Sequence, residues 1–212
     1  MKRILTAPAL LLAFALMISG LAAFAAPPGG PSEDNPPVLV KAAVAPVVDG
    51  VLDDPAWATG LKFDGFKTFK PDYNKDASQR TEAYIAYDAE NFYFAFRCFD
   101  SEPAKIKAAV SKRDNIFQDD LVFINIDTFN DRQSAFAFIV NPLGIQGDGM
   151  VNVQGNLETS FDAVWYSKGA IDDKGWTVEA RIPLQSIRFP NKDVLTWRIL
   201  FIRFFTGTSE QV

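Results

Sequence analysis

Apolar and polar residues alternate along much of the chain with a period of two, which is the pattern of β-strands. The clearest case is 176–182, in which the even-numbered residues are apolar and the odd-numbered residues are polar. This alternation predicts a half-buried antiparallel strand. Runs rich in aromatic and β-branched residues predict further strands at 81–87, 92–99, 121–127, 135–141, 145–153, 163–170 and 196–205.

Turn-like segments separate these predicted strands. Residues 88–91 join the strands 81–87 and 92–99 and predict a hairpin. Helical signals are few and short, at 54–59, at 102–110 and as a single turn at 184–188. Many short strands with so little helix predict an all-β fold, an antiparallel, jelly-roll-like β-sandwich with one or two short helices.

Two of the predicted strands are apolar on both faces. Nearly every residue of 92–99 is apolar, and 197–205 is similar. A strand in a sandwich needs only one apolar face, so the second must be covered by loops, a ligand, another domain or a partner. Covering loops are the commoner explanation. Because the sequence stops soon after an apolar strand, we also expect it to be the N-terminal part of a longer protein.

The first 25 residues have the layout of a secretory signal peptide. Lys2 and Arg3 precede a mostly apolar stretch, which ends at the cleavage-like triplet Ala23-Phe24-Ala25. We therefore expect export to the periplasm, the outer membrane or the outside of the cell, with an uncleaved membrane anchor as the alternative. Residues 26–37 are rich in proline and glycine and predict a flexible linker, which leaves 38–212 as the folded domain.

Composition removes several classes of protein. Lys and Arg total 21 and Asp and Glu total 26, and this acidic balance argues against nucleic-acid binding. The chain has no histidine, which excludes a Ser-His-Asp triad and every His-ligated metal or haem site. Its one cysteine, Cys98, excludes an internal disulfide and lies in an apolar strand, where we expect an inert thiol.

Three motifs, in this order, resemble the family 9 carbohydrate-binding module. They are Asp49-Gly50 with Pro55-Ala56-Trp57, then Arg113-Asp114 with Asp119-Asp120 and Asn141-Pro142, then Gly175-Trp176 with Glu179 and Ile182-Pro183. The likeness covers roughly 38–205 and is strongest to a secreted bacterial version that precedes an outer-membrane region. The resemblance implies a β-sandwich, carbohydrate binding, attachment to polysaccharide-degrading enzymes and, in some members, bound calcium.

Sugar binding requires an aromatic ring that stacks on the apolar face of a pyranose. Trp165 follows a polar loop and is the best stacking candidate, with a core position as an equally weighted alternative. Tyr73, in the loop 70–75, is a second candidate ring. The other tryptophans, Trp57, Trp176 and Trp197, are expected in the core.

Planar polar groups would hold the hydroxyl groups of the sugar. A guanidinium can donate two parallel hydrogen bonds, and Arg113 lies in a charged loop where it could do so. The alternative for Arg113 is an ion pair with a nearby aspartate, Asp114, Asp119 or Asp120. Asp120 and Asn141 complete the predicted set of hydrogen-bonding residues, although Asn141 followed by proline is also an ordinary turn start.

Acidic residues cluster between 114 and 148 and indicate a calcium site. Carboxylate oxygens are the ligands that Ca²⁺ prefers, and the chain offers few softer ones. The predicted ligands are Asp119, Asp127, Asp131 and Asp148. Solvated carboxylates and salt bridges are the commoner explanation of such a cluster, and none of these residues follows the EF-hand spacing.

Together these features predict non-catalytic binding of a polysaccharide or oligosaccharide, linked to carbohydrate catabolism and glycoside hydrolysis by attached or partner domains. No pair of carboxylates stands out as a glycosidase site, so a binding module is favoured over an enzyme. One alternative is an envelope docking domain of a larger outer-membrane protein that binds no sugar. A remote alternative is a haem-binding sandwich that uses Met150 and a lysine.

Overall fold

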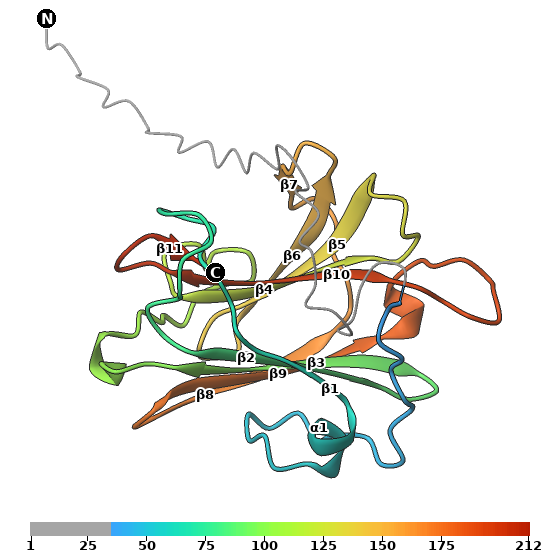
Figure 1. Ribbon diagram of the computed structural model, residues 1–212, viewed down its shortest axis with the longest axis horizontal. Helices are drawn as coiled ribbons and strands as arrows, with labels where there is room; N and C mark the ends of the chain where they lie inside the picture. The colour runs from blue at the N-terminus through green and yellow to red at the C-terminus, as the bar shows by residue number, and fades with distance from the viewer. Residues whose placement is uncertain (1–34) are drawn as a thin grey trace, which may run out of the picture.

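The computed structural model describes residues 35–212, so the predicted signal peptide and most of the predicted linker lie outside the described residues. Two antiparallel sheets pack face to face, as Figure 1 shows. This arrangement confirms the predicted all-β sandwich. Among residues 35–212, no helix combines the length and the apolar character needed to cross a membrane.

The two sheets differ in size and order. The five-stranded sheet runs in the order β1 (Leu61–Phe63), β2 (Thr81–Tyr87), β3 (Asn91–Phe99), β9 (Gly175–Pro183) and β8 (Tyr166–Asp172). The six-stranded sheet runs in the order β11 (Glu210–Gln211), β10 (Arg198–Phe205), β4 (Leu121–Asp127), β5 (Ser134–Val140), β6 (Gln146–Asn152) and β7 (Leu157–Glu158). One α-helix, α1 (Pro55–Thr59), and two 3-10 turns, Pro103–Lys105 and Leu184–Ser186, complete the elements of the described chain.

Every predicted strand is present, with ends that move by a few residues. The strands that the sequence did not predict are β1, β7 and β11. Each has only two or three residues. A period of two cannot be recognised over so short a stretch, so these strands are defined by their neighbours in the sheet.

The helix predicted for 102–110 is wrong. Only the 3-10 turn Pro103–Lys105 forms there, and the chain then runs beside Asp120. The backbone N–H of Lys107 donates to Oδ2 of Asp120 at 3.0 Å, and the Lys107 carbonyl accepts from the Asp120 N–H at 2.9 Å. These contacts satisfy the N–H and C=O of Lys107, which a helix would have paired internally, so tertiary contacts override the weak helical signal.

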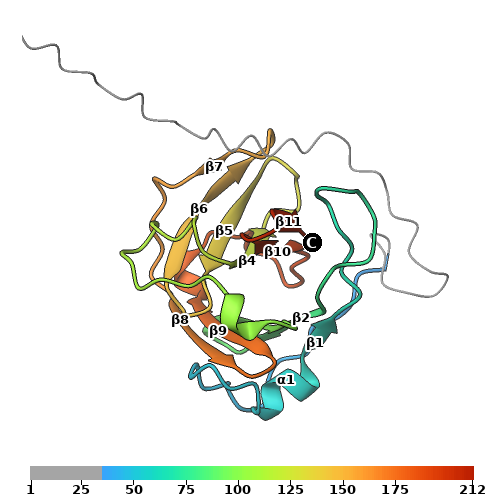
Figure 2. The same ribbon diagram turned by 90° about the vertical axis from the view of Figure 1, so that its left-hand side faces the viewer.

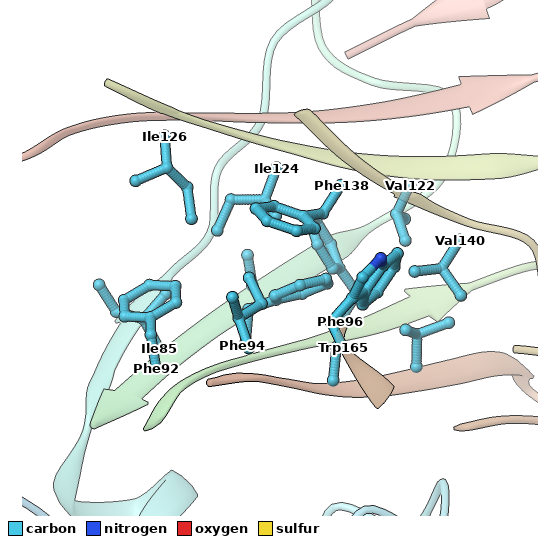
Figure 3. Packing of buried hydrophobic residues seen from close by; sticks show 14 of the residues in the cluster. Ile85, Phe92, Phe94, Phe96, Val122, Ile124, Ile126, Phe138, Val140 and Trp165 are labelled. Atoms are coloured by element: carbon cyan, nitrogen blue, oxygen red, sulfur yellow. The ribbon is translucent and has the colours of Figure 1, made fainter. Parts of the chain in front are cut away.

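The core lies between the two sheets and follows the predicted alternation. Phe92, Phe94 and Phe96 of β3 point inward and meet Ile124 of β4 and Phe138 of β5, as the close view in Figure 3 shows. The other core residues come mainly from β9, β4 and β5. Alternate residues of these strands are therefore removed from water, and this burial is the main stabilising contribution to the fold.

A folded segment covers the outer face of the five-stranded sheet. Figure 2 shows α1 outside this sheet, on the side away from the core. Ala56 and Trp57 of this segment pack on Tyr93 and Ala95, which face outward from β3. The expectation that loops cover the second apolar face of 92–99 is thus confirmed. Trp57, which was expected in the core, is buried, but it lies on the outer side of the five-stranded sheet rather than between the two sheets.

Candidate functional site

Trp165, the predicted stacking residue, is part of the core. Its side chain is 4% exposed, and its ring lies 6.2 Å from that of Phe94 and 5.2 Å from that of Phe138, centroid to centroid. Figure 3 shows the ring between the sheets. The stacking assignment is therefore wrong. The sequence carries no local signal for this outcome, because Ala163, Val164 and Trp165 are all apolar, and only the structure shows that Val164 is exposed between two buried neighbours.

Arg113 lies over this tryptophan, with its guanidinium carbon 5.9 Å from the ring centroid. Its Nε donates to Oδ1 of Asp148 at 2.8 Å, and its Nη1 donates to Oε1 of Gln146 at 2.9 Å. Its Nη2 donates to the carbonyl of Ala163 at 2.8 Å and also to Asp148. Arg113 forms an ion pair with Asp148, which is distant in sequence, rather than with one of the expected partners, Asp114, Asp119 or Asp120. Most of the hydrogen-bonding capacity of Arg113 is thus used within the protein.

Asp148 is buried beneath this arginine. Its Oδ2 accepts from the Ala163 N–H at 2.6 Å, and its own N–H donates to Oδ1 of Asp114 at 3.0 Å. Burial raises the pKa of the Asp148 carboxyl, and its hydrogen bonds and Arg113 oppose that rise. Oxygen atoms of Asp114, Asp148 and Asp162 lie within 4.8 Å of one another, the one such group among residues 35–212.

Asn141, Asp119 and Asp120 hold loops together. Nδ2 of Asn141 donates to Oδ2 of Asp119 at 2.8 Å and to the carbonyl of Ala109 at 3.0 Å. Oδ1 of Asn141 accepts from two backbone N–H groups of its own turn. Asp120 accepts from Thr206 N–H at 2.8 Å as well as from Lys107. All three side chains are buried with internal partners, so the prediction that Asp120 and Asn141 contact sugar is wrong.

The four predicted calcium ligands are not gathered in one place. Asp127 accepts from the N–H of Phe129 at 3.1 Å and of Arg132 at 2.9 Å and so caps the turn after β4. Asp131 is exposed in the same turn. Of the predicted ligands, only Asp148 belongs to the carboxylate group with Asp114 and Asp162.

Tyr73 is the predicted aromatic residue of the sugar site that lies at the surface. It is 56% exposed and meets Phe69, which is 44% exposed, edge to face with ring centroids 6.4 Å apart. Nζ of Lys70 lies 6.0 Å from the centroid of the Phe69 ring. The sequence analysis missed Phe69, because a single phenylalanine in a loop has no periodic neighbour that marks it as exposed.

The loop that carries these rings is held firmly. Thr68 N–H donates to the carbonyl of Lys75 at 2.9 Å, and Lys75 N–H donates to Oγ1 of Thr68 at 3.0 Å. Asn74 has a φ of 60° and closes the turn by donating to the Thr68 carbonyl at 2.7 Å. Phe69 N–H donates to the carbonyl of Gln211 at 2.7 Å, and Figure 2 shows the loop beside β11. The two rings therefore form a preorganised aromatic edge, defined here as Phe69 and Tyr73.

The described residues thus form a two-sheet antiparallel sandwich with an exposed aromatic edge on a fixed loop. Residues 48–196 match the family described as "Carbohydrate family 9 binding domain-like". The match spans more than half of the chain, and the chain belongs to this family. No curated protein sequence matches the chain.

Solved structures share the fold. One is a family 9 carbohydrate-binding module from Caldicellulosiruptor kristjanssonii in complex with cellotriose, with a TM-score of 0.56, 17% identity, and coverage of 80% of this chain and 77% of that chain. A second is a module of the same family and organism in complex with glucose, with a TM-score of 0.55, 17% identity, and coverage of 81% of each chain. At this identity the likeness establishes the architecture.

Proposed function

We propose that this domain is a non-catalytic carbohydrate-binding module. Its family supports the proposal, and the solved modules of similar fold are described in complex with cellotriose and with glucose. The observation that carries the proposal for this chain is the aromatic edge of Phe69 and Tyr73. It is a preformed apolar surface among polar groups, which is what binding of a sugar ring requires.

Binding would proceed without any covalent step. The apolar face of a sugar ring would stack on Tyr73, and hydroxyl groups would bond to exposed polar side chains of the same loop, Lys70, Asp72 and Asn74. Because the loop is already fixed by Thr68 and Gln211, binding would cost little ordering of the backbone. The role of the exported domain would be to hold a polysaccharide or oligosaccharide near an attached or partner enzyme that degrades it.

Titration calorimetry tests this function. The protein is titrated with glucose, xylose, mannose and galactose oligosaccharides, and its fold is checked by circular dichroism. Millimolar or tighter binding of one class supports a carbohydrate module. Absence of binding across the panel by a folded protein would remove the proposal and leave a sandwich whose likeness to sugar binders is architectural.

A further inference from the structure

The loop that carries the aromatic edge has more positive than negative charge. Between positions 67 and 76 it contains three lysines and two aspartates, namely Lys67, Lys70, Lys75, Asp72 and Asp76. All five residues are exposed. The chain as a whole has a formal net charge of −5, so this loop places positive charge beside two exposed rings in an acidic protein.

The acidic residues of the loop neutralise its lysines unevenly. Nζ of Lys67 donates to Oδ1 of Asp76, and this hydrogen bond lowers the pKa of the Asp76 carboxyl. Within residues 35–212, Lys70 and Lys75 form no ion pair with any carboxylate, and this includes Asp72. Two ammonium groups of the loop therefore lack a negatively charged partner in the described chain.

The side chain of Lys70 extends over the aromatic edge. Its Nζ lies 6.0 Å from the centroid of the Phe69 ring, and that centroid lies 6.4 Å from the centroid of the Tyr73 ring. The ammonium group and the two rings are thus close enough to contact one ligand the size of a sugar residue. An aromatic surface with a cation beside it suits a ligand that is apolar on one face and negatively charged at its rim.

Both lysines extend from a fixed backbone. The carbonyl of Lys70 accepts from the N–H of Gln211 at 3.1 Å. The N–H of Lys75 donates to Oγ1 of Thr68 at 3.0 Å, and the Lys75 carbonyl accepts from the Thr68 N–H at 2.9 Å. Only the lysine side chains would need to be ordered when they meet a ligand, which keeps the entropic cost of binding low.

We propose that the sugar bound at the aromatic edge carries a carboxylate, as the residues of a uronic-acid polysaccharide do. This inference rests on the proposed function and names the ligand class of the same site. The apolar face of the uronic acid stacks on Tyr73, and Nζ of Lys70 donates a charge-assisted hydrogen bond to the carboxylate. Lys75 adds a second positive charge on the same loop.

Desolvation favours an acidic sugar over a neutral one at this site. A ring that stacks on the aromatic edge displaces water from the groups around it, including the ammonium of Lys70. An ammonium that loses water without gaining an anion is penalised, whereas a carboxylate replaces the lost water with a stronger partner. A neutral sugar offers only hydroxyl groups, which compensate the charge less well.

Calorimetry with matched pairs of ligands is the first test. The trimer of β-1,4-linked glucuronic acid and its neutral counterpart, cellotriose, differ only in the carboxylates. Trigalacturonic acid and its carboxyl-reduced form are a second such pair. In at least one pair the acidic member is expected to bind at least about tenfold more tightly at low salt. The ratio of the two affinities should fall toward one in high salt, which screens exposed charges.

The second test changes the protein. Lys70→Gln removes the charge but keeps a hydrogen-bond donor, and the ratio of acidic to neutral affinity is expected to fall to near one. Lys192→Gln is the matched control, because it changes the net charge equally at an exposed residue that precedes β10, whereas β11 and the aromatic edge lie at the other end of that strand. This control should keep the ratio of the unchanged protein. Circular dichroism checks that both variants fold.

Three results would overturn the inference. If neutral members bind and neither acidic member binds more tightly than its counterpart, the ligand is a neutral sugar and the proposed function still stands. If Lys70→Gln and Lys192→Gln lower the ratio equally, net charge rather than contact with Lys70 is responsible. If the folded protein binds none of the four ligands nor the wider panel, the proposed function fails together with this inference.

Discussion

The Nε1–H of Trp57 donates a 2.7 Å hydrogen bond to Oε1 of Glu179, in the middle of β9. The other carboxylate oxygen, Oε2, accepts from the N–H groups of Gly50 at 2.8 Å and Asp49 at 3.0 Å. Hydrogen bonds to Glu179 therefore join the first family motif to the third. They hold residues 49–57 against the outer face of the five-stranded sheet. Gly50 has a φ of +92°, and an added Cβ would lie 3.3 Å from Ala170 Cβ, so glycine is required there.

We expect Trp57→Phe to lower the free energy of unfolding by about 2 kcal/mol beyond the decrease that the smaller ring causes by itself. The additional decrease arises because the buried carboxylate of Glu179 loses a hydrogen-bond donor. Urea unfolding at neutral pH measures the effect. Trp165→Phe is the matched control, since Trp165 is equally buried and its Nε1 has no hydrogen-bond partner among residues 35–212. Equal losses in the two variants would show that the Trp57–Glu179 hydrogen bond contributes no net stability.

Arg113→Gln is expected to destabilise the domain by about 3 kcal/mol at neutral pH, because the buried carboxylate of Asp148 loses its cation. The pKa of Asp148 is already raised by burial, so its ionisation costs the folded state more than the unfolded state. The loss should therefore be smallest below pH about 4, the unfolded pKa of an aspartate, and should grow as pH rises through the raised folded pKa.

Urea titrations of Arg113→Gln across this range measure that dependence. The double variant Arg113→Gln/Asp148→Asn removes the ionisable group and should be less sensitive to pH than Arg113→Gln. A loss for Arg113→Gln that is constant from acid to neutral pH would contradict an uncompensated Asp148 charge as its cause.

The ion pair of Arg97 with Asp172 should act in the opposite direction with pH. The guanidinium donates two hydrogen bonds, at 2.8 and 3.0 Å, and lowers the pKa of Asp172. Its contribution is present above the unfolded pKa and is lost as pH falls through the lowered folded pKa. Because Asp172 is half exposed, the contribution should be less than about 1 kcal/mol and weaker in high salt.

Asp172→Asn compared with the unchanged protein, at neutral pH and near pH 2, measures this contribution. The difference in unfolding free energy should be smaller at the lower pH, because the pKa of Asp172 is lowered and protonation in the folded state removes the ion pair. Asp173→Asn changes the neighbouring exposed carboxylate and is the control. If both variants lose the same stability, net charge rather than the ion pair is responsible.

Tyr73→Ala should weaken sugar binding at least about tenfold, equivalent to about 1.4 kcal/mol, if the aromatic edge carries the affinity. Phe129→Ala is the control, because Phe129 is 54% exposed but lies in the turn after β4. Calorimetry with the best oligosaccharide of the panel compares the two variants. Unchanged affinity in a folded Tyr73→Ala protein would move the sugar site elsewhere on the domain.

Calcium binding stays a prediction. Of the four predicted ligands only Asp148 lies in a group of carboxylates, and a site there would use two residues outside the predicted set, Asp114 and Asp162. An ion there would share Asp148 with Arg113. Calcium that binds only the native state must raise the melting temperature, and a chelator must reverse the rise. Asp162→Asn should abolish the rise, and Asp131→Asn, outside the group, should preserve it. An unchanged melting temperature in the unchanged protein would remove the metal assignment.

The sequence by itself determined the sandwich, most of its strands and, within the alternating strands, which residues face the core. Those features depend on the period-two alternation of apolar residues. This pattern is local, because it can be recognised from residues close together in the sequence, such as Phe92, Phe94 and Phe96. Cys98 follows the same logic. It lies fully buried in β3, where burial raises the pKa of its thiol to about 12, as expected of an inert core residue.

Only the tertiary structure decided which polar residues meet. The chain has 26 acidic residues, and nothing local marks Asp148 as the partner of Arg113 or Glu179 as the partner of Trp57. Such pairs form where the packing of distant segments leaves a buried charge or donor that must be satisfied. Asp120 and Asn141 support loops for the same reason, since Asp120 accepts from the backbone N–H of Lys107 and Asn141 donates to the carbonyl of Ala109.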